Sequence, residues 1–217
     1  MIKLTELVVL LHGYNKNKKD MYALRDNLED LKYEVILAEL PLLFKSVRHC
    51  TDIFVEQLKK IKADLKKGEK LSLVGHSTGG IVIRKAIKDL EIKPYINRCV
   101  LISTPHRGSK LADKAAKFSK TFINLFKPVR SITTKSIEEM DLKTPPEIEI
   151  GAIAGSKSNL FLGRFLREKN DGRIEVESVK YGDLKDFMVL PYGHKEIHHQ
   201  LETAQLVDNF LREGRFK

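Results

Sequence analysis

The chain has 217 residues, of which 42% are hydrophobic, so its length and composition predict one globular domain and exclude a disordered chain. No run approaches the roughly 18 apolar residues of a membrane-spanning helix, and the short apolar run LVVLLHGY near the start does not fit a signal peptide. The net charge of +10 is spread along the chain without a basic patch interleaved with aromatic residues, which favours a solvated, lysine-rich surface over nucleic-acid binding.

Apolar, strand-like runs alternate with helical patterns along the chain. We expect strands at 7–11, 33–38, 71–74, 99–103, 148–154 and 187–190, with helices near 19–31, 48–67, 78–91 and 196–212. Continuous apolar strands that alternate with helices indicate a parallel sheet covered on both faces. The predicted fold class is therefore α/β, with about six mostly parallel strands in a single domain spanning residues 1–217.

Residues 107–147 interrupt this alternation, and we expect them to form a lid or cap insertion within the domain. The stretch SKLADKAAKFSKTFINLF, residues 109–126, predicts a helix within the insertion. One face of this helix is apolar and the other carries lysines. The apolar face comprises Leu111, Ala115, Phe118, Phe122, Leu125 and Phe126. The favoured interpretation of the helix is packing on the core, and the alternative is a lid that covers an acyl pocket or meets a lipid surface.

The stretch LSLVGHSTGG, residues 71–80, joins a predicted strand to a predicted helix and matches the G-x-S-x-G nucleophile elbow. In such an elbow the serine lies on a sharp, strained turn, and glycines flank it because the turn leaves no room for side chains. We therefore expect Ser77 to be the nucleophile. The backbone N–H of Thr78, at the start of the helix, is expected to stabilise the oxyanion.

A second oxyanion donor has to come from the loop after an earlier strand. The first predicted strand ends at His12-Gly13, which makes the N–H of Tyr14 the candidate. We interpret His12 itself as a structural residue that bonds within the loop.

The general base is expected late in the chain, in the order Ser…Asp/Glu…His. His194 follows the last predicted strand, on a loop before the final helix, and is the predicted base. His198 is the alternative, although we interpret it and His199 as surface residues of that helix. His106 comes too early for the expected order but could line the site.

The acid of the triad is expected after the penultimate strand, where Asp171-Gly172 forms a predicted turn. Asp171 is therefore the predicted acid. Asp183 and Asp186 are alternatives nearer the last strand, and a solvated surface turn is the other interpretation of an Asp-Gly pair.

An acyl pocket is expected beside the carboxyl edge of the sheet, where ligands bind in such folds. The segment LPLLF, residues 40–44, follows a strand at that edge. We expect Leu42 and Phe44 to form one wall of the pocket, together with Phe118 and Phe122 of the insertion. Simple packing of these side chains is an equal alternative at this stage.

Four segments resemble a known family and occur in its order. LLHGY resembles its oxyanion loop, GHSTGG its elbow, ISTPHRGSKLAD its T-P-x-x-G-S segment, and NDGRIEVESV followed by VLPYGHKEI its acid turn and histidine loop. The chain thus resembles small α/β-hydrolases of the bacterial lipase and serine-esterase type, with minimal triacylglycerol lipases and lipase-like GPI inositol-deacylases among them. The resemblance implies a minimal α/β-hydrolase fold and a Ser-His-Asp triad.

The sequence departs from this family at two places. The first two antiparallel strands of the family have no counterpart ahead of the oxyanion loop, as in the minimal lipases. Thr78 stands where Met, Leu or Gln is more usual, but the chemistry needs only its backbone N–H.

These features predict a serine esterase that cleaves a small-molecule or lipid ester through an acyl-enzyme. A thioesterase or amidase on the same triad is the alternative, and a catalytically silent binding protein is a lesser one. No metal or cofactor is expected, since no clustered Cys/His spacing suggests one. The basic segment 110–126 leaves open a weak contact with an anionic membrane surface. The missing signal peptide and the two unpatterned cysteines, Cys50 and Cys99, favour a cytoplasmic location.

Overall fold

The computed structural model describes residues 6–118 and 126–217. Phe122, which we expected to line the acyl pocket, lies outside the described residues. Among the described residues, no helix is both long enough and apolar enough to span a bilayer.

Six strands form one sheet in the order β2-β1-β3-β4-β5-β6, and every neighbouring pair is parallel. The strands are β1 (Leu7–Leu11), β2 (Glu34–Ala38), β3 (Leu71–His76), β4 (Ile96–Ile102), β5 (Glu149–Gly155) and β6 (Asp186–Leu190). The prediction of about six mostly parallel strands is confirmed, and each predicted strand is found within a few residues of its expected bounds.

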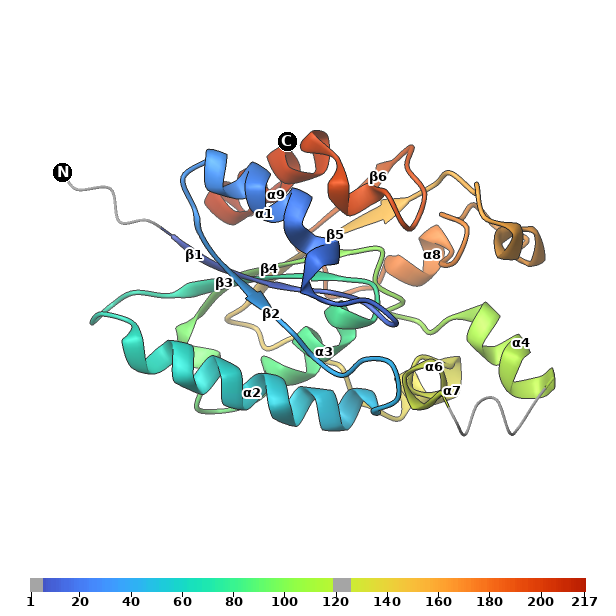
Figure 1. Cartoon of the computed structure of the whole chain (residues 1–217), viewed down its shortest axis with the longest axis horizontal. Coiled ribbons are helices and arrows are strands. Elements are labelled where there is room, and N and C mark those ends of the chain that lie inside the picture. The colour runs from blue at the N-terminus through green and yellow to red at the C-terminus, as the bar shows by residue number, and fades with distance from the viewer. Residues whose placement is uncertain (1–5, 119–125) are drawn as a thin grey trace.

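Helices cover both faces of the sheet (Figure 1). The longer ones are α1 (Tyr22–Asp30), α2 (Val47–Asp64), α3 (Thr78–Ala86) and α9 (Leu201–Glu213). The shorter ones are α4 (Lys110–Phe118), α6 (Lys127–Ser131), α7 (Thr134–Glu138) and α8 (Val176–Val179). Four 3₁₀ turns join them among the described residues, namely η1 (Lys18–Met21), η2 (Lys93–Tyr95), η3 (Phe161–Phe165) and η4 (Ile197–His199).

The two faces of the sheet have separate hydrophobic cores, because successive side chains of a strand point to opposite faces. Val9 and Leu11 of β1 pack with residues of α2 and α3 on one face. Val8 and Leu10 pack with residues of α1 and α9 on the other. Figure 1 shows the same arrangement, with α2 and α3 below the sheet and α1 and α9 above it. Burial on both faces explains why the strand sequences are continuously apolar.

Two predicted helices differ from their expected bounds. The helix expected over 78–91 ends at Ala86, and tight turns continue the chain, with Asp89 N–H donating to the carbonyl of Ala86. The helix expected over 196–212 begins only at Leu201, because Gln200 has extended backbone (φ −82°, ψ 138°). The residues before Gln200 form η4 instead, and this turn points His198 inward. The expectation that His198 is a surface residue was therefore wrong, since its side chain is fully buried.

The insertion differs from its favoured interpretation in its first helix. Ala112 is the one buried residue of α4, while Leu111 and Ala115 are partly exposed and Phe118 is 95% exposed. The predicted apolar face of α4 therefore does not pack on the core. Farther along, Pro128, Ser131 and Ile137 of α6 and α7 are buried against the domain.

Candidate active site

Ser77 lies on a strained turn between the end of β3 and the start of α3. Its backbone has φ 54° and ψ −125°, a conformation that non-glycine residues rarely adopt. A hydrogen bond connects this turn to β4, since the N–H of Ser77 donates to the carbonyl of Ile102 at 2.8 Å. Gly79 is required beside it because a Cβ there would meet the backbone carbonyls of Leu11 and His12. The local structure is that of a nucleophile elbow.

His194 lies on the loop after β6, and its side chain contacts Ser77. Its Nε2 is 3.0 Å from Oγ of Ser77, and both side chains are buried. The neighbouring ring nitrogen, Nδ1, is 2.8 Å from Oδ2 of Asp171. Because an ionised carboxylate only accepts hydrogen bonds, Nδ1 carries the proton and Nε2 is free to accept from the serine hydroxyl.

Asp171 is fully buried in the turn that follows η3. Its Oδ1 accepts the backbone N–H groups of Arg173 (2.9 Å) and Ile174 (2.8 Å), so both carboxylate oxygens have partners. Burial alone would raise the pKa of Asp171. The charge and hydrogen bond of His194, together with the two backbone N–H groups, outweigh burial, and the net pKa lies below its ordinary value. The carboxylate is therefore ionised at neutral pH.

Thr78 and Tyr14, the residues expected to supply the oxyanion donors, both lie near Ser77. Thr78 is the first residue of α3, where N–H groups have no partner within the helix and the helix dipole is positive. Tyr14 lies directly after His12 and Gly13 on the loop that follows β1. A Cβ at Gly13 would lie 3.0 Å from Cβ of Ser77, so this loop passes directly beside the elbow. The geometry suits an oxyanion hole formed by Tyr14 and Thr78.

The buried side chain of His12 stabilises this loop through two hydrogen bonds to the backbone. Its Nδ1 bonds the carbonyl of Gly13 at 2.9 Å, and its Nε2 accepts the N–H of Leu40 at 3.2 Å. Burial lowers the pKa of His12, so the ring is neutral and can both donate and accept. The structural role expected for His12 is confirmed.

The predicted acyl wall is not brought to Ser77. The cavity at Ser77 measures about 10 Å³, room for roughly one water molecule. Its lining consists of Gly13, Tyr14, Lys16, His76, Ser77, Arg173, His194, Lys195 and His198. Leu42 is buried in the core, Phe44 stacks on Phe126 with ring centroids 6.0 Å apart, and Phe118 is exposed at the end of α4. Their role in substrate binding stays a prediction.

A second group of polar residues, His76, His198 and Asp20, adjoins Ser77 and His194. The sequence analysis did not indicate this group. His76 donates from Nε2 to the carbonyl of His194 at 3.0 Å, and its ring stacks on that of His198 with centroids 3.9 Å apart. Nε2 of His198 is 3.1 Å from Oδ2 of Asp20, which precedes α1. Burial, and then the neighbouring histidines, lower the pKa of His76 well below its ordinary value. His198, the alternative base, thus bonds Asp20 rather than Ser77.

This group is a poor fit for a metal ion, although donor atoms of Asp20, His76 and His198 lie within 4.8 Å of one another. A ring nitrogen coordinates in the plane of its ring, and the rings of His76 and His198 are stacked at an interplanar angle of 22°. Their lone pairs therefore do not converge on one point. Lys16 also places its ammonium 2.6 Å from Asp20.

The alternative acids are committed elsewhere. Oδ2 of Asp183 accepts the N–H of Thr144 at 3.3 Å, and Oδ2 of Asp186 accepts that of Phe216 at 2.6 Å. Neither carboxylate bonds His194, so the structure brings Ser77, His194 and Asp171 together and leaves Asp183 and Asp186 outside.

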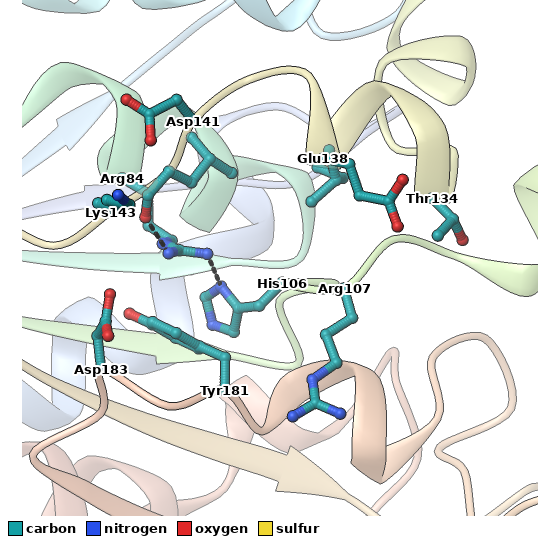
Figure 2. Close-up of a pocket in the computed structure, with 11 residues that line it drawn as sticks. Arg84, His106, Arg107, Thr134, Glu138, Asp141, Lys143, Tyr181 and Asp183 are labelled. Carbon is teal, nitrogen blue, oxygen red and sulfur yellow. Dashed lines mark hydrogen bonds between the residues drawn. The ribbon is translucent and has the colours of Figure 1, made fainter.

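A larger cavity, of about 550 Å³, lies apart from Ser77 and contains His106 (Figure 2). Figure 2 shows Arg84 and His106 pointing toward each other, with Nη1 of Arg84 3.2 Å from Nδ1 of His106. The guanidinium also bonds the carbonyl of Leu142 and lies 4.0 Å over the ring of Tyr181. These contacts connect α3, the loop after β4 and the segment before β6. None of the triad residues lines this cavity, so its size alone does not make it the site.

Comparisons with known proteins identify the family and the fold. The family described as Putative serine esterase (DUF676) matches residues 1–149. Triacylglycerol lipase 2 of Saccharomyces cerevisiae is 28% identical over 152 residues, and the match covers 60% of this chain and 46% of the yeast protein. The match thus spans less than half of that relative.

Solved structures show the same fold. The mature form of Bacillus licheniformis lipase BlEst2 superposes with a TM-score of 0.78 at 20% identity, covering 96% of this chain and 91% of the lipase. The metagenomic carboxyl esterase MGS0156 gives a TM-score of 0.75 at 13% identity, over 96% of this chain and 76% of that one. The fold is therefore that of the α/β-hydrolases. With more than half of its length matched by the family, the chain belongs to the serine esterase family DUF676.

Proposed function

We propose that this protein hydrolyses carboxylic esters with Ser77 as nucleophile, His194 as general base and Asp171 as the acid that orients His194. The observation that carries the proposal is the pair of buried contacts at His194, 3.0 Å to Oγ of Ser77 and 2.8 Å to Oδ2 of Asp171. The strained backbone of Ser77 adds support, because such strain is concentrated at functional sites.

The reaction follows from the positions of these groups. Oγ of Ser77 attacks the ester carbonyl carbon while its proton passes to Nε2 of His194, and the carbonyl oxygen becomes an oxyanion that accepts the N–H groups of Tyr14 and Thr78. The carbon–oxygen bond to the alcohol then breaks, and His194 returns the proton to the leaving alcohol. A water molecule then attacks the acyl-enzyme carbonyl and gives its proton to His194. The bond from the acyl carbon to Oγ breaks, His194 returns the proton to Ser77, and the acid is released.

A panel of p-nitrophenyl esters of increasing chain length, with a matched thioester and anilide, tests the reaction class. The proposal predicts ester hydrolysis that His194→Ala lowers by about 10³-fold or more. Faster turnover of the thioester or anilide would move the assignment to a thioesterase or amidase. No turnover of any compound by the folded protein would favour the catalytically silent binding protein.

Contact with an anionic lipid surface is a second candidate function, and a specific surface favours it. Four exposed apolar side chains, which we call the aromatic patch, lie on α4 and η3: Phe118 (95% exposed), Phe161 (68%), Leu162 (49%) and Phe165 (50%). Lys114 of α4 donates to the carbonyl of Phe165 at 2.5 Å, which joins the two elements. Arg164 lies 5.5 Å over the ring of Phe161. Exposed aromatics with cations among them are suited to an anionic membrane surface.

Vesicle sedimentation tests this second candidate. We expect binding to phosphatidylserine-rich vesicles that weakens with salt and is lost in the double variant Phe161→Ser/Phe165→Ser. Leu90→Ser is the control, since Leu90 is 78% exposed but lies outside the patch. Binding that is equal in all three proteins would contradict the assignment.

We also propose that the protein is cytoplasmic and that residues 107–147 act as a cap.

A further inference from the structure

Three cationic side chains line the cavity that contains Ser77. Lys16 comes from the loop after β1, Arg173 from the acid turn, and Lys195 directly follows His194. Within the described part of the chain, no Asp or Glu lines this cavity. The acidic and basic side chains that line this cavity are therefore all of one charge sign.

Two of these cations have no compensating carboxylate. The ammonium of Lys16 is neutralised by Asp20, 2.6 Å away. Arg173 and Lys195 form no ion pair with any residue that the structure describes, and Nε of Arg173 is buried without a hydrogen-bond partner. An unpaired guanidinium is a strong donor for carboxylate and phosphate oxygens.

Arg173 also lies close to the oxyanion loop. Burial raises the pKa of the Tyr14 hydroxyl, and the positive charge of Arg173 partly opposes that rise. Arg173 and Tyr14 line the same cavity, while the backbone N–H of the same arginine donates to Asp171 at 2.9 Å. The turn that positions the acid of the triad therefore also brings a free positive charge to the substrate side of Ser77.

The space at Ser77 strengthens the argument. With about 10 Å³ beside the serine, an ester reaches Oγ only by moving or contacting the side chains at the mouth. The lining includes three long cationic side chains, whereas Leu42, Phe44 and Phe118, the residues of the predicted acyl wall that the structure describes, lie elsewhere. A substrate with an anionic group near the reacting bond would be attracted where a purely apolar acyl chain meets charged groups.

We propose that the site selects esters that carry a carboxylate or phosphate within a few bonds of the scissile bond, held by Arg173 and Lys195. This inference rests on the proposed esterase function and names its substrate class. The anion gains its charge-assisted contacts without any change in the chemical step described above.

Matched pairs of esters test the selection. On the alcohol side, 3-acetoxybenzoate is compared with the neutral 3-acetoxybenzamide, and 3-acetoxyphenyl phosphate forms a phosphate arm. On the acyl side, monomethyl adipate is compared with the methyl ester of its monoamide. We expect kcat/KM for the anionic member to exceed that of its neutral partner by about fivefold or more in at least one pair. The excess should shrink between about 50 and 500 mM salt.

Variants assign the preference to the two residues. Arg173→Met and Lys195→Met should each lower the anionic-to-neutral ratio of kcat/KM, and Lys195→Glu should lower it further. The ratio is the readout because a cation near the oxyanion affects neutral esters as well. Lys67→Glu is the matched control for Lys195→Glu, and Lys67→Met is the matched control for the two Met variants, because each control changes the net charge by the same amount as its partner. Lys67 is exposed on the turn before β3, at the amino end of the sheet.

The outcomes separate this inference from the proposed function. Hydrolysis of neutral esters with no preference for the anionic members in either pair would overturn the inference and leave the esterase in place. A preference that the Lys67 controls abolish as strongly as the Arg173 and Lys195 variants would also overturn it, because the effect would then come from net charge. No hydrolysis of any ester would contradict the proposed function itself.

Discussion

His76 donates a hydrogen bond from Nε2 to the backbone carbonyl of His194, 3.0 Å away. The residue immediately before the proposed nucleophile therefore bonds the main chain of the proposed base, and their two loops are joined at a second point besides the Ser77–His194 contact. In the proposed mechanism His76 touches no reacting atom, so we expect it to act as a positioning residue.

Replacing His76 tests this link. We expect His76→Ala to lower kcat by about 10- to 100-fold with a smaller change in KM, because a displaced base loses alignment with the serine. His76→Gln keeps a donor and should recover part of the loss. Steady-state kinetics on a neutral ester measures both. Equal effects of Ala and Gln, with kcat unchanged in both, would show that the hydrogen bond does not position His194.

Asp171→Asn removes the acceptor that fixes the tautomer of His194. The amide can still accept the N–H groups of Arg173 and Ile174 through its oxygen, so we expect the fold to persist. Activity should fall by about 10³- to 10⁴-fold, because Nδ1 of His194 would then face a donor. Circular dichroism measures whether the fold persists, and single-turnover kinetics measures the loss of activity. Near-native activity in a folded Asp171→Asn protein would assign the acid elsewhere.

Gly79→Ala probes the packing of the elbow. An added Cβ would lie 2.8 Å from the carbonyl oxygen of Leu11, a backbone atom that cannot easily move. We expect the free energy of unfolding to drop by more than about 2 kcal/mol. Gly182→Ala is the matched control, since nothing lies within 4 Å of its Cβ position, and its stability should hold or rise by up to about 1 kcal/mol. Urea unfolding of both variants makes the comparison, and equal stabilities would contradict the tight elbow.

Stability should fall as the pH drops below about 6.5. Burial lowers the pKa of His12, His76, His106 and His198 in the folded chain. The unfolded chain takes up these protons near pH 6.5, while the folded chain takes them up only at lower pH. The stabilisation is therefore complete above about pH 6.5 and is lost progressively below it, by up to about 1.4 kcal/mol per pH unit for each histidine.

Urea unfolding between about pH 7.5 and 5 measures this dependence. His198→Gln should flatten the slope, because one proton fewer is taken up on unfolding. His49→Gln should leave the slope as it is, since His49 is exposed on α2. A slope that is flat in the unmodified protein would mean that the buried histidines titrate normally.

The sequence predicted those features that depend on local pattern. Apolar runs located the six strands, and the glycines around Ser77 indicated the elbow because its sharp turn leaves no room for side chains there. The positions of Asp171 and His194 followed from the order of strands, since the carboxyl ends of parallel strands meet at one edge.

Features that depend on contacts between distant segments could not be predicted in this way. Asp20 and His198 are 178 positions apart, and neither has a neighbouring pattern that indicates the pair. His198 was assigned to a helix surface because helical spacing cannot show that Gln200 is extended. The substrate side was predicted from apolar residues near the right edge, yet the cavity is lined by Lys16, Arg173 and Lys195. Arg173 could have been noticed, since it lies two residues after Asp171.

The proposed function requires Ser77, activated by His194, to be a reactive nucleophile. Labelling of the folded protein with a fluorophosphonate, followed by peptide mass mapping, is the first measurement to make. We expect a single modification on the peptide that contains Ser77, absent from Ser77→Ala and strongly slowed in His194→Ala. An unlabelled folded protein, or a modification on any other residue, would contradict the proposed function.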